Sequence, residues 1–134
     1  MPVTNTWSDD TKTVLVNDFQ GFWTWDEFEA GVQRGYELIR GVDQVVYVIA
    51  KNFTNTPKGN AMAAFRRVEN FPANMALLII HSENMNTLSR TLLNVFLKVY
   101  GRQAGKVIYV ESMENAYKVI EKHREQSVVG QAVI

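Results

Sequence analysis

Three short apolar runs constrain the fold of this chain more than any other feature. They are VVYVIA at 45–50, MALLII at 75–80 and KVIYV at 106–110. The first two are typical of central strands, and the third predicts a further strand. The segments between them are long enough to form helices. Strands that alternate with helices favour parallel pairing, because parallel neighbours need a crossover connection.

Two further strands are predicted near the N-terminus. TKTVLVNDF at 11–19 has strand character, and VTNTW at 3–7 can pair with it across the turn Ser8-Asp9-Asp10, so that residues 1–10 form an N-terminal strand or arm. We therefore predict one α/β domain over residues 1–134, with a mixed, mainly parallel sheet of four to five strands and helices packed on it.

The first helix has an unusually clear beginning. Thr24 and Glu27 form a T-x-x-E capping box, and Trp23 and Phe28 occupy the positions of a hydrophobic staple. Gly41 is predicted to end this helix. Its inward side chains are predicted to be Phe28, Val32 and Ile39, with Tyr36 beside them, and the spacing of Gly31 and Gly35 indicates close packing on the sheet.

Three more helices follow in the predicted order. They cover about 60–70, about 86–100 up to Gly101, and a last segment that Ser112 caps. The inward residues are predicted to be Leu88, Leu92, Val95, Phe96 and Val99 in the third helix, and Met113, Ala116, Tyr117 and Ile120 in the last. The apolar C-terminal tail at 126–134 has two open interpretations, a terminal strand or strap on its own domain and a contact in a homodimer.

Composition narrows the classes of function. Fourteen basic residues balance fourteen acidic ones, so we expect no nucleic-acid partner. The chain has no cysteine and only two histidines, and we expect neither a metal site nor a cofactor. MALLII, the longest purely apolar stretch, is far shorter than the roughly 20 residues of a membrane span, and MPVTNTWSDD does not resemble a secretory signal. We expect a cytoplasmic protein without a membrane span.

The order of these elements resembles the STAS fold of anti-sigma-factor antagonists, and more closely its SpoIIAA-like branch of bacterial proteins. The similarity extends from Thr13 to Arg124, and is carried by VVYVIA, MALLII with its polar end HSEN, LSRTLLNVFLKVYG and KVIYVESMENAYKVIEK. In antagonist members, a D-S-x-G loop after the strand equivalent to 45–50 carries a serine whose phosphorylation switches partner binding. The equivalent stretch here is NTPKG, where Thr56 and Gly59 come nearest to that pattern.

The loop KNFTNTPKGN at 51–60 is the first candidate site. Its residues for a phosphorylation switch or a partner contact are Thr54, Thr56, Lys58 and Gly59. Structurally, Thr56-Pro57 favours the start of a helix, with threonine as N-cap and proline in the first turn. A hydroxyl at a helix N-terminus is also well placed for phosphorylation, because free backbone N–H groups favour an anion there.

Two other groups of residues are candidates. The polar end of the second central strand carries His81, Ser82 and Glu83, at the edge where open α/β sheets bind ligands. Adjacent residues of an extended chain point to opposite faces, so we predict a polar strand end and no catalytic residue. Phe22 belongs to the predicted aromatic cluster at the first helix, and an apolar ligand pocket would be lined by Trp23, Trp25, Phe28, Phe53, Met62 and Phe65.

Two functional hypotheses from different classes remain. The first is a non-enzymatic STAS-like regulatory or interaction module that binds a protein partner through 51–60 and the helix after it. The second is a small carrier or sensor of an apolar, lipid-like ligand. An enzyme is disfavoured, because no nucleophile–base pair can be assembled from the sequence.

Overall fold

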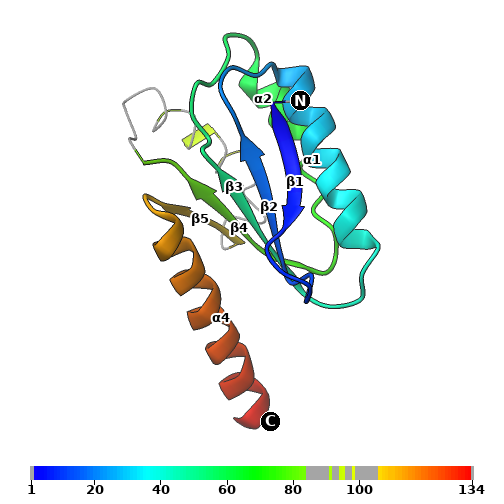
Figure 1. Ribbon diagram of the computed structural model, residues 1–134, viewed down its shortest axis with the longest axis vertical. Helices are drawn as coiled ribbons and strands as arrows, with labels where there is room; N and C mark the ends of the chain where they lie inside the picture. Colours follow the sequence, from blue (N-terminus) through cyan, green and yellow to red (C-terminus); the bar gives the residue numbers. More distant parts are fainter. Residues whose placement is uncertain (1, 84–90, 92–93, 96–97, 99–105, 134) are drawn as a thin grey trace.

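The computed structural model describes residues 2–83, 91, 94, 95, 98 and 106–133. The predicted helix at 86–100 therefore lies largely outside the described residues. The described elements are β1 (Val3–Trp7), β2 (Val14–Phe19), α1 (Trp25–Arg40), β3 (Val46–Lys51), α2 (Ala61–Arg67), β4 (Met75–His81), β5 (Val107–Val110) and α4 (Met113–Val133) (Figure 1).

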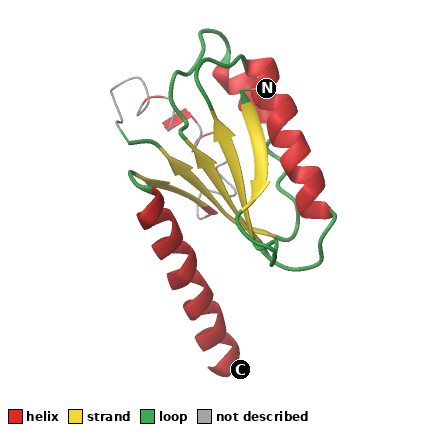
Figure 2. Ribbon diagram, in the orientation of Figure 1, coloured by secondary structure: helices red, strands yellow, loops and turns green. Residues whose placement is uncertain are grey.

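The five strands form a single sheet in their sequence order, β1-β2-β3-β4-β5. β1 pairs antiparallel with β2, as predicted from the turn between them, and the other three pairings are parallel. An α/β fold with a mixed sheet is thus confirmed. The carboxyl ends of β2, β3 and β4 reach the same edge of the sheet, next to the loop that joins β3 to α2 (Figure 2).

Helices cover both faces of the sheet. Side chains along β3 alternate, so that Val48 and Ala50 belong to the apolar cluster under α1 and α2, whereas Tyr47 and Ile49 belong to the cluster under α4. This two-sided burial explains why the central strands are continuous apolar runs in the sequence. Within the described part of the chain, no helix is both long and apolar enough to cross a membrane.

The predicted start and end of α1 are confirmed. The Thr24 hydroxyl accepts from the Glu27 backbone N–H at 3.1 Å, and the Glu27 carboxylate accepts from the Thr24 backbone N–H at 3.1 Å. The ring centroids of Trp23 and Phe28 lie 6.0 Å apart, as a hydrophobic staple requires, and Gly41 is the C-cap.

Two predictions about the last helix need correction. The tail is not a strand, because α4 continues through Val133 and extends past the sheet (Figure 1). Ala116 and Ile120 are buried as predicted, but Tyr117 is 38% exposed and its hydroxyl forms a 3.0 Å hydrogen bond with Ser8. The predicted Ser112 cap is present, since its hydroxyl accepts from the Asn115 N–H at 3.1 Å.

Candidate functional site

The loop between β3 and α2 is held at the carboxyl edge of the sheet by hydrogen bonds to two other segments. The Asn52 and Phe53 N–H groups donate to Nδ1 and to the carbonyl oxygen of His81, at 3.0 and 2.9 Å. The Trp23 indole donates to the Thr54 carbonyl at 3.0 Å, and the Asn55 amide donates to the Gly21 carbonyl at 3.2 Å. The first half of the loop is therefore fixed against β4 and against the segment before α1.

The predicted helix start at Thr56 is wrong. α2 begins at Ala61, and its N-cap is Asn60, whose side-chain oxygen accepts from the Ala63 N–H at 3.1 Å. Thr54 and Thr56 are both half-buried in the loop before the helix. Neither threonine is therefore positioned by the N-terminus of α2, which was the physical argument for an anion at this position.

Lys58 and Gly59 complete the loop. Lys58 is exposed, and Gly59 has a φ of 124°, a conformation that residues with a side chain rarely adopt. A Cβ at Gly59 would also lie 3.3 Å from Cδ1 of Trp25. Glycine thus permits the turn into α2 and the packing of this turn on the start of α1.

The structure brings together five of the six residues of the predicted apolar pocket, but their rings pack on one another. The centroids of Phe28 lie 6.2 Å from Phe53 and 5.7 Å from Phe65, and those of Trp23 and Trp25 lie 5.3 Å apart. Met62, the sixth residue, is 37% exposed on α2. Phe19, which the sequence analysis did not single out, joins the cluster with its ring centroid 5.1 Å from Trp23.

A small cavity lies beneath this cluster, between α1 and the sheet. Its volume is about 30 Å³, and its walls include Phe28, Phe53 and the polar side chain Asn17. This is room for about one water molecule, whereas pockets for small organic ligands have volumes of roughly 300–1,000 Å³. The cavity that the described residues enclose here is too small for a lipid-like molecule.

Phe22 lies outside the cluster in which the sequence placed it. Phe22 is 88% exposed, although its two neighbours, Gly21 and Trp23, are held in place by hydrogen bonds. Gly21 adopts a φ of 60° and binds Asn55, and Trp23 turns inward and binds Thr54. Because Trp23 takes the staple position, the preceding side chain points away from the core.

The polar end of β4 forms a connected group with the ends of β2 and β3. His81 is 1% exposed and Ser82 is 2% exposed. Asn52, with a φ of 58°, joins two strands, because its backbone N–H donates to His81 and its side-chain amide donates to Asp18 at 3.3 Å. The sequence indicated His81 and Ser82 but not Asp18 and Asn52, although polar residues at the ends of neighbouring strands were the available signal.

Burial lowers the pKa of His81, because an imidazolium loses its hydration in the interior. The charges of Glu83 and Asp18 act in the opposite direction, and the charge of Lys51 adds to the lowering. The ring is therefore neutral near pH 7. Among the described residues, Nε2 of His81 and the Ser82 hydroxyl are buried without a hydrogen-bond partner.

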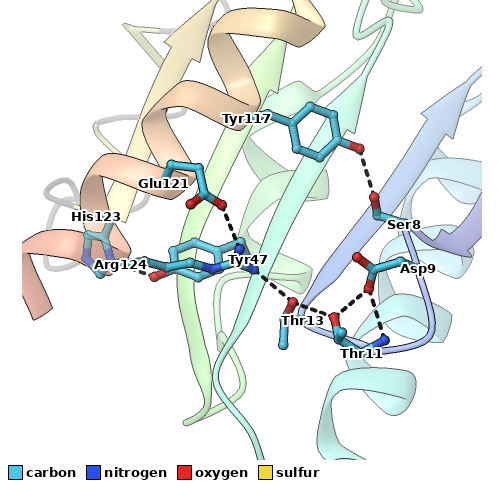
Figure 3. A network of polar contacts seen from close by, with 9 residues as sticks. All are labelled: Ser8, Asp9, Thr11, Thr13, Tyr47, Tyr117, Glu121, His123 and Arg124. Carbon is cyan, nitrogen blue, oxygen red and sulfur yellow. Dashed lines mark hydrogen bonds and ion pairs between the residues drawn. The ribbon is translucent and has the colours of Figure 1, made fainter. Parts of the chain in front are cut away.

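A second polar group attaches α4 to the opposite end of the sheet (Figure 3). The Tyr47 hydroxyl and Nδ1 of His123 are 2.8 Å apart, so this histidine of α4 has a partner on β3. Arg124 donates to Thr13 and to Glu121, both at 2.8 Å, and its guanidinium lies 5.4 Å from the centre of the Tyr47 ring. These contacts tie α4 to β3 and to the residue before β2.

Within the described residues, no three histidine, cysteine or carboxylate side chains are grouped as a metal site requires. Comparison of the chain with protein-family models, with curated proteins and with solved structures found no match.

Proposed function

We propose that this chain is a non-enzymatic, STAS-like regulatory or interaction module that binds a protein partner at the carboxyl edge of its sheet. The observation that carries the proposal is the 88% exposure of Phe22 on a segment whose neighbours are fixed. Large aromatic side chains in exposed positions are frequent anchors of protein interfaces, because they bury much apolar area at a small entropic cost.

The surroundings of Phe22 fit such an interface. The Asn55–Gly21 hydrogen bond places the 52–60 loop beside the residue that precedes Phe22. The loop continues through the exposed Lys58 into α2, where Met62 is 37% exposed. An apolar anchor with polar groups around it is the common organisation of an interface.

The alternative, a carrier of a lipid-like ligand, is less well supported. Its candidate residues pack into a filled aromatic cluster over a cavity of about 30 Å³. An enzymatic function also lacks a supporting arrangement, since no base among the described residues contacts the buried Ser82 hydroxyl.

The test is site-specific photo-crosslinking followed by a quantitative binding assay. The photoreactive residue p-benzoylphenylalanine replaces Phe22 in one variant and Leu38 in a matched control, since Leu38 is a large apolar residue of α1 with 39% exposure. We expect a protein to be crosslinked from position 22 and not from position 38. Binding of that protein in purified form should weaken by at least about thirtyfold in Phe22→Ala, as for an interface hot spot.

Equal binding of Phe22→Ala, Leu38→Ala and the unchanged chain would contradict the proposal. The same assay with Thr54→Glu and Thr56→Glu tests the phosphorylation switch that the family resemblance implies. Unchanged affinity in both variants would remove that switch while leaving the partner surface in place.

A further inference from the structure

A groove lies at the amino edge of the parallel strands, between these strand ends and α4. This edge is opposite to the one that carries the 52–60 loop (Figure 2). Each of the four parallel strands contributes the residue that precedes it, and α4 contributes two more. These residues are Thr13, Val45, Asn74, Lys106, His123 and Arg124. The volume of the groove is about 740 Å³, and pockets for small organic ligands have volumes of roughly 300–1,000 Å³.

Two side-chain amides hold the walls of this groove in place. The Asn74 amide donates to the carbonyl oxygens of Val42 and Gln44, at 3.1 and 3.0 Å. The Gln44 amide donates to the carbonyl oxygens of Thr11 and Lys12, at 3.0 and 3.1 Å. These bonds join the segments that precede β2, β3 and β4. The shape of the groove is therefore set before a ligand arrives, which lowers the entropic cost of binding.

Part of the lining is apolar and open to solvent. Val45 is 54% exposed, Ala73 is exposed and Ala76 is half-buried, and all three line the groove. Contact with an apolar group would remove this surface from water, which is favourable. The groove thus suits a ligand with an apolar body.

The charged side chains that line the groove are basic. The charge of Arg124 is compensated, because its guanidinium donates to Glu121 at 2.8 Å and also attracts the Asp9 carboxylate. Lys106 is exposed and has no hydrogen bond or ion pair to a described residue. Within the described part of the chain, no carboxylate side chain lines the groove. Lys106 therefore leaves one uncompensated positive charge, which matches a ligand with a single negative charge.

His123 adds a hydrogen-bonding group to the wall of the groove. Tyr47 is buried, and its hydroxyl lies 2.8 Å from Nδ1 of His123 (Figure 3). When the hydroxyl donates to Nδ1, the second ring nitrogen, Nε2, carries the ring proton. This nitrogen has no hydrogen bond to a described residue and does not belong to the buried unpaired atoms. It is therefore free to donate to a ligand oxygen.

We propose that this groove binds a small organic monocarboxylate with an apolar body. The Lys106 ammonium supplies the attracting charge, His123 supplies a hydrogen-bond donor, and Val45 supplies apolar contact. Hydrogen bonds from such donors to a carboxylate are charge-assisted and stronger than those between neutral groups. This site goes beyond the proposed protein interface, since it lies at the other edge of the sheet and is measured on the isolated chain.

The experiment is an NMR titration of the full chain with ¹⁵N-labelled histidine at constant ionic strength and about pH 8, where an ordinary histidine is neutral. Sodium benzoate is the probe. Benzamide has its shape without the charge, sodium acetate has the charge without the ring, and phenyl phosphate carries a second negative charge. His81, the second histidine of the chain, is buried at the other edge of the sheet and serves as an internal control.

We expect benzoate to shift the ring signals of His123 in a saturable way and to leave those of His81 unchanged. Benzamide and acetate should bind at least about tenfold more weakly, since each lacks one of the two features. Lys106→Gln should weaken benzoate binding by at least about tenfold, the effect of losing one charge-assisted hydrogen bond. Lys122→Gln, a matched change at an exposed lysine of α4 that does not line the groove, should leave the affinity unchanged.

A second pair of variants tests the apolar part of the lining. Val45→Asp places a negative charge in the groove and should abolish the shift of His123. Leu38→Asp, at a large apolar residue of α1 with 39% exposure, is the matched control and should bind benzoate normally. Unchanged His81 signals show that each variant is folded.

Three outcomes would overturn the proposal. They are no saturable shift of His123 with benzoate, an affinity for benzamide or acetate equal to that for benzoate, and equal affinities in the Lys106→Gln and Lys122→Gln variants. Tighter binding of phenyl phosphate than of benzoate would refute the assignment of a monocarboxylate. Phe22→Ala should bind benzoate like the unchanged chain, so a failure of this site and a failure of the protein interface are distinguishable.

Discussion

At the scale of single residues, two glycines of α1 decide how closely this helix approaches the sheet. A Cβ at Gly31 would lie 2.4 Å from Cγ1 of Val3, and one at Gly35 would lie 3.1 Å from Oδ1 of Asn17. The prediction of close packing from their spacing is confirmed. Each glycine faces a different strand, Gly31 facing β1 and Gly35 facing β2, so both are needed to seat the helix.

Gly31→Ala should lower the free energy of unfolding by about 1–3 kcal/mol, because the added methyl group overlaps a buried side chain. Urea denaturation measures the change. Gly41→Ala is the matched control, since Gly41 has a φ of −78° and its nearest contact would be 3.4 Å. If the overlap is the cause, the cost of Gly31→Ala must be smaller in a Val3→Ala background, and an unchanged cost would contradict this explanation.

At the scale of elements, α4 combines local signals with distant partners. Its Ser112 cap and its buried Ala116 and Ile120 follow from residues close in sequence, and the sequence predicted them. Its polar attachment through Tyr47 and His123 joins residues 76 positions apart, so no local pattern indicated it. Burial raises the pKa of Tyr47 while Arg124 lowers it, and the hydroxyl remains protonated at neutral pH.

Tyr47→Phe should destabilise the protein by about 1 kcal/mol and increase hydrogen exchange along α4, because it leaves Nδ1 of His123 without its partner. Tyr117→Phe removes an exposed hydrogen bond of the same helix, to Ser8, and should have a smaller effect. Exchange measured by mass spectrometry compares the two variants. Equal protection of α4 in both would show that the Tyr47 contact does not attach the helix.

At the scale of the whole molecule, the end of β4 at His81 and Ser82 is joined to the 52–60 loop and to β5. The ring and the carbonyl oxygen of His81 bind Asn52 and Phe53, and the next residue, Ser82, donates its N–H to Val110 at 3.2 Å. A proton on Nδ1 would remove the hydrogen bond from Asn52. Protonation of this single ring therefore opposes the folded state as a whole.

The free energy of unfolding should consequently depend on pH. Since burial lowers the pKa of His81, the unfolded chain binds more protons than the folded chain below the ordinary histidine pKa of 6.5. Stability should be full above that pH and decrease as the pH falls below it, with a slope of at most about 1.4 kcal/mol per pH unit from this site.

Denaturation at a series of pH values measures this slope. His81→Gln should reduce it, and His123→Gln, at the second histidine, is the control. An identical slope in the unchanged chain and in His81→Gln would exclude His81 as its source.

The sequence by itself determined the five described strands, α1 and much of the core around them, because apolar runs, the capping box of α1 and helical periodicity act between neighbours along the chain. It did not determine where α2 begins. Thr56-Pro57 is a good local start signal, but Asn60 is the cap, after a turn in which Gly59 packs on Trp25. The sequence also predicted that Phe22 belongs to the packed aromatic cluster. In the structure Trp23 packs in this cluster, whereas Phe22 is exposed.

Only the tertiary structure decided the candidate sites. Asp18 and His81 come from different strands and Asn52 directly follows a third, and parallel pairing through β3 brings them to one edge of the sheet. The aromatic residues around Trp23 form a filled cluster because four separate segments converge there. Whether a polar or aromatic side chain is exposed, paired or left with an unsatisfied proton depends on such distant neighbours, and the local sequence contains no signal for them.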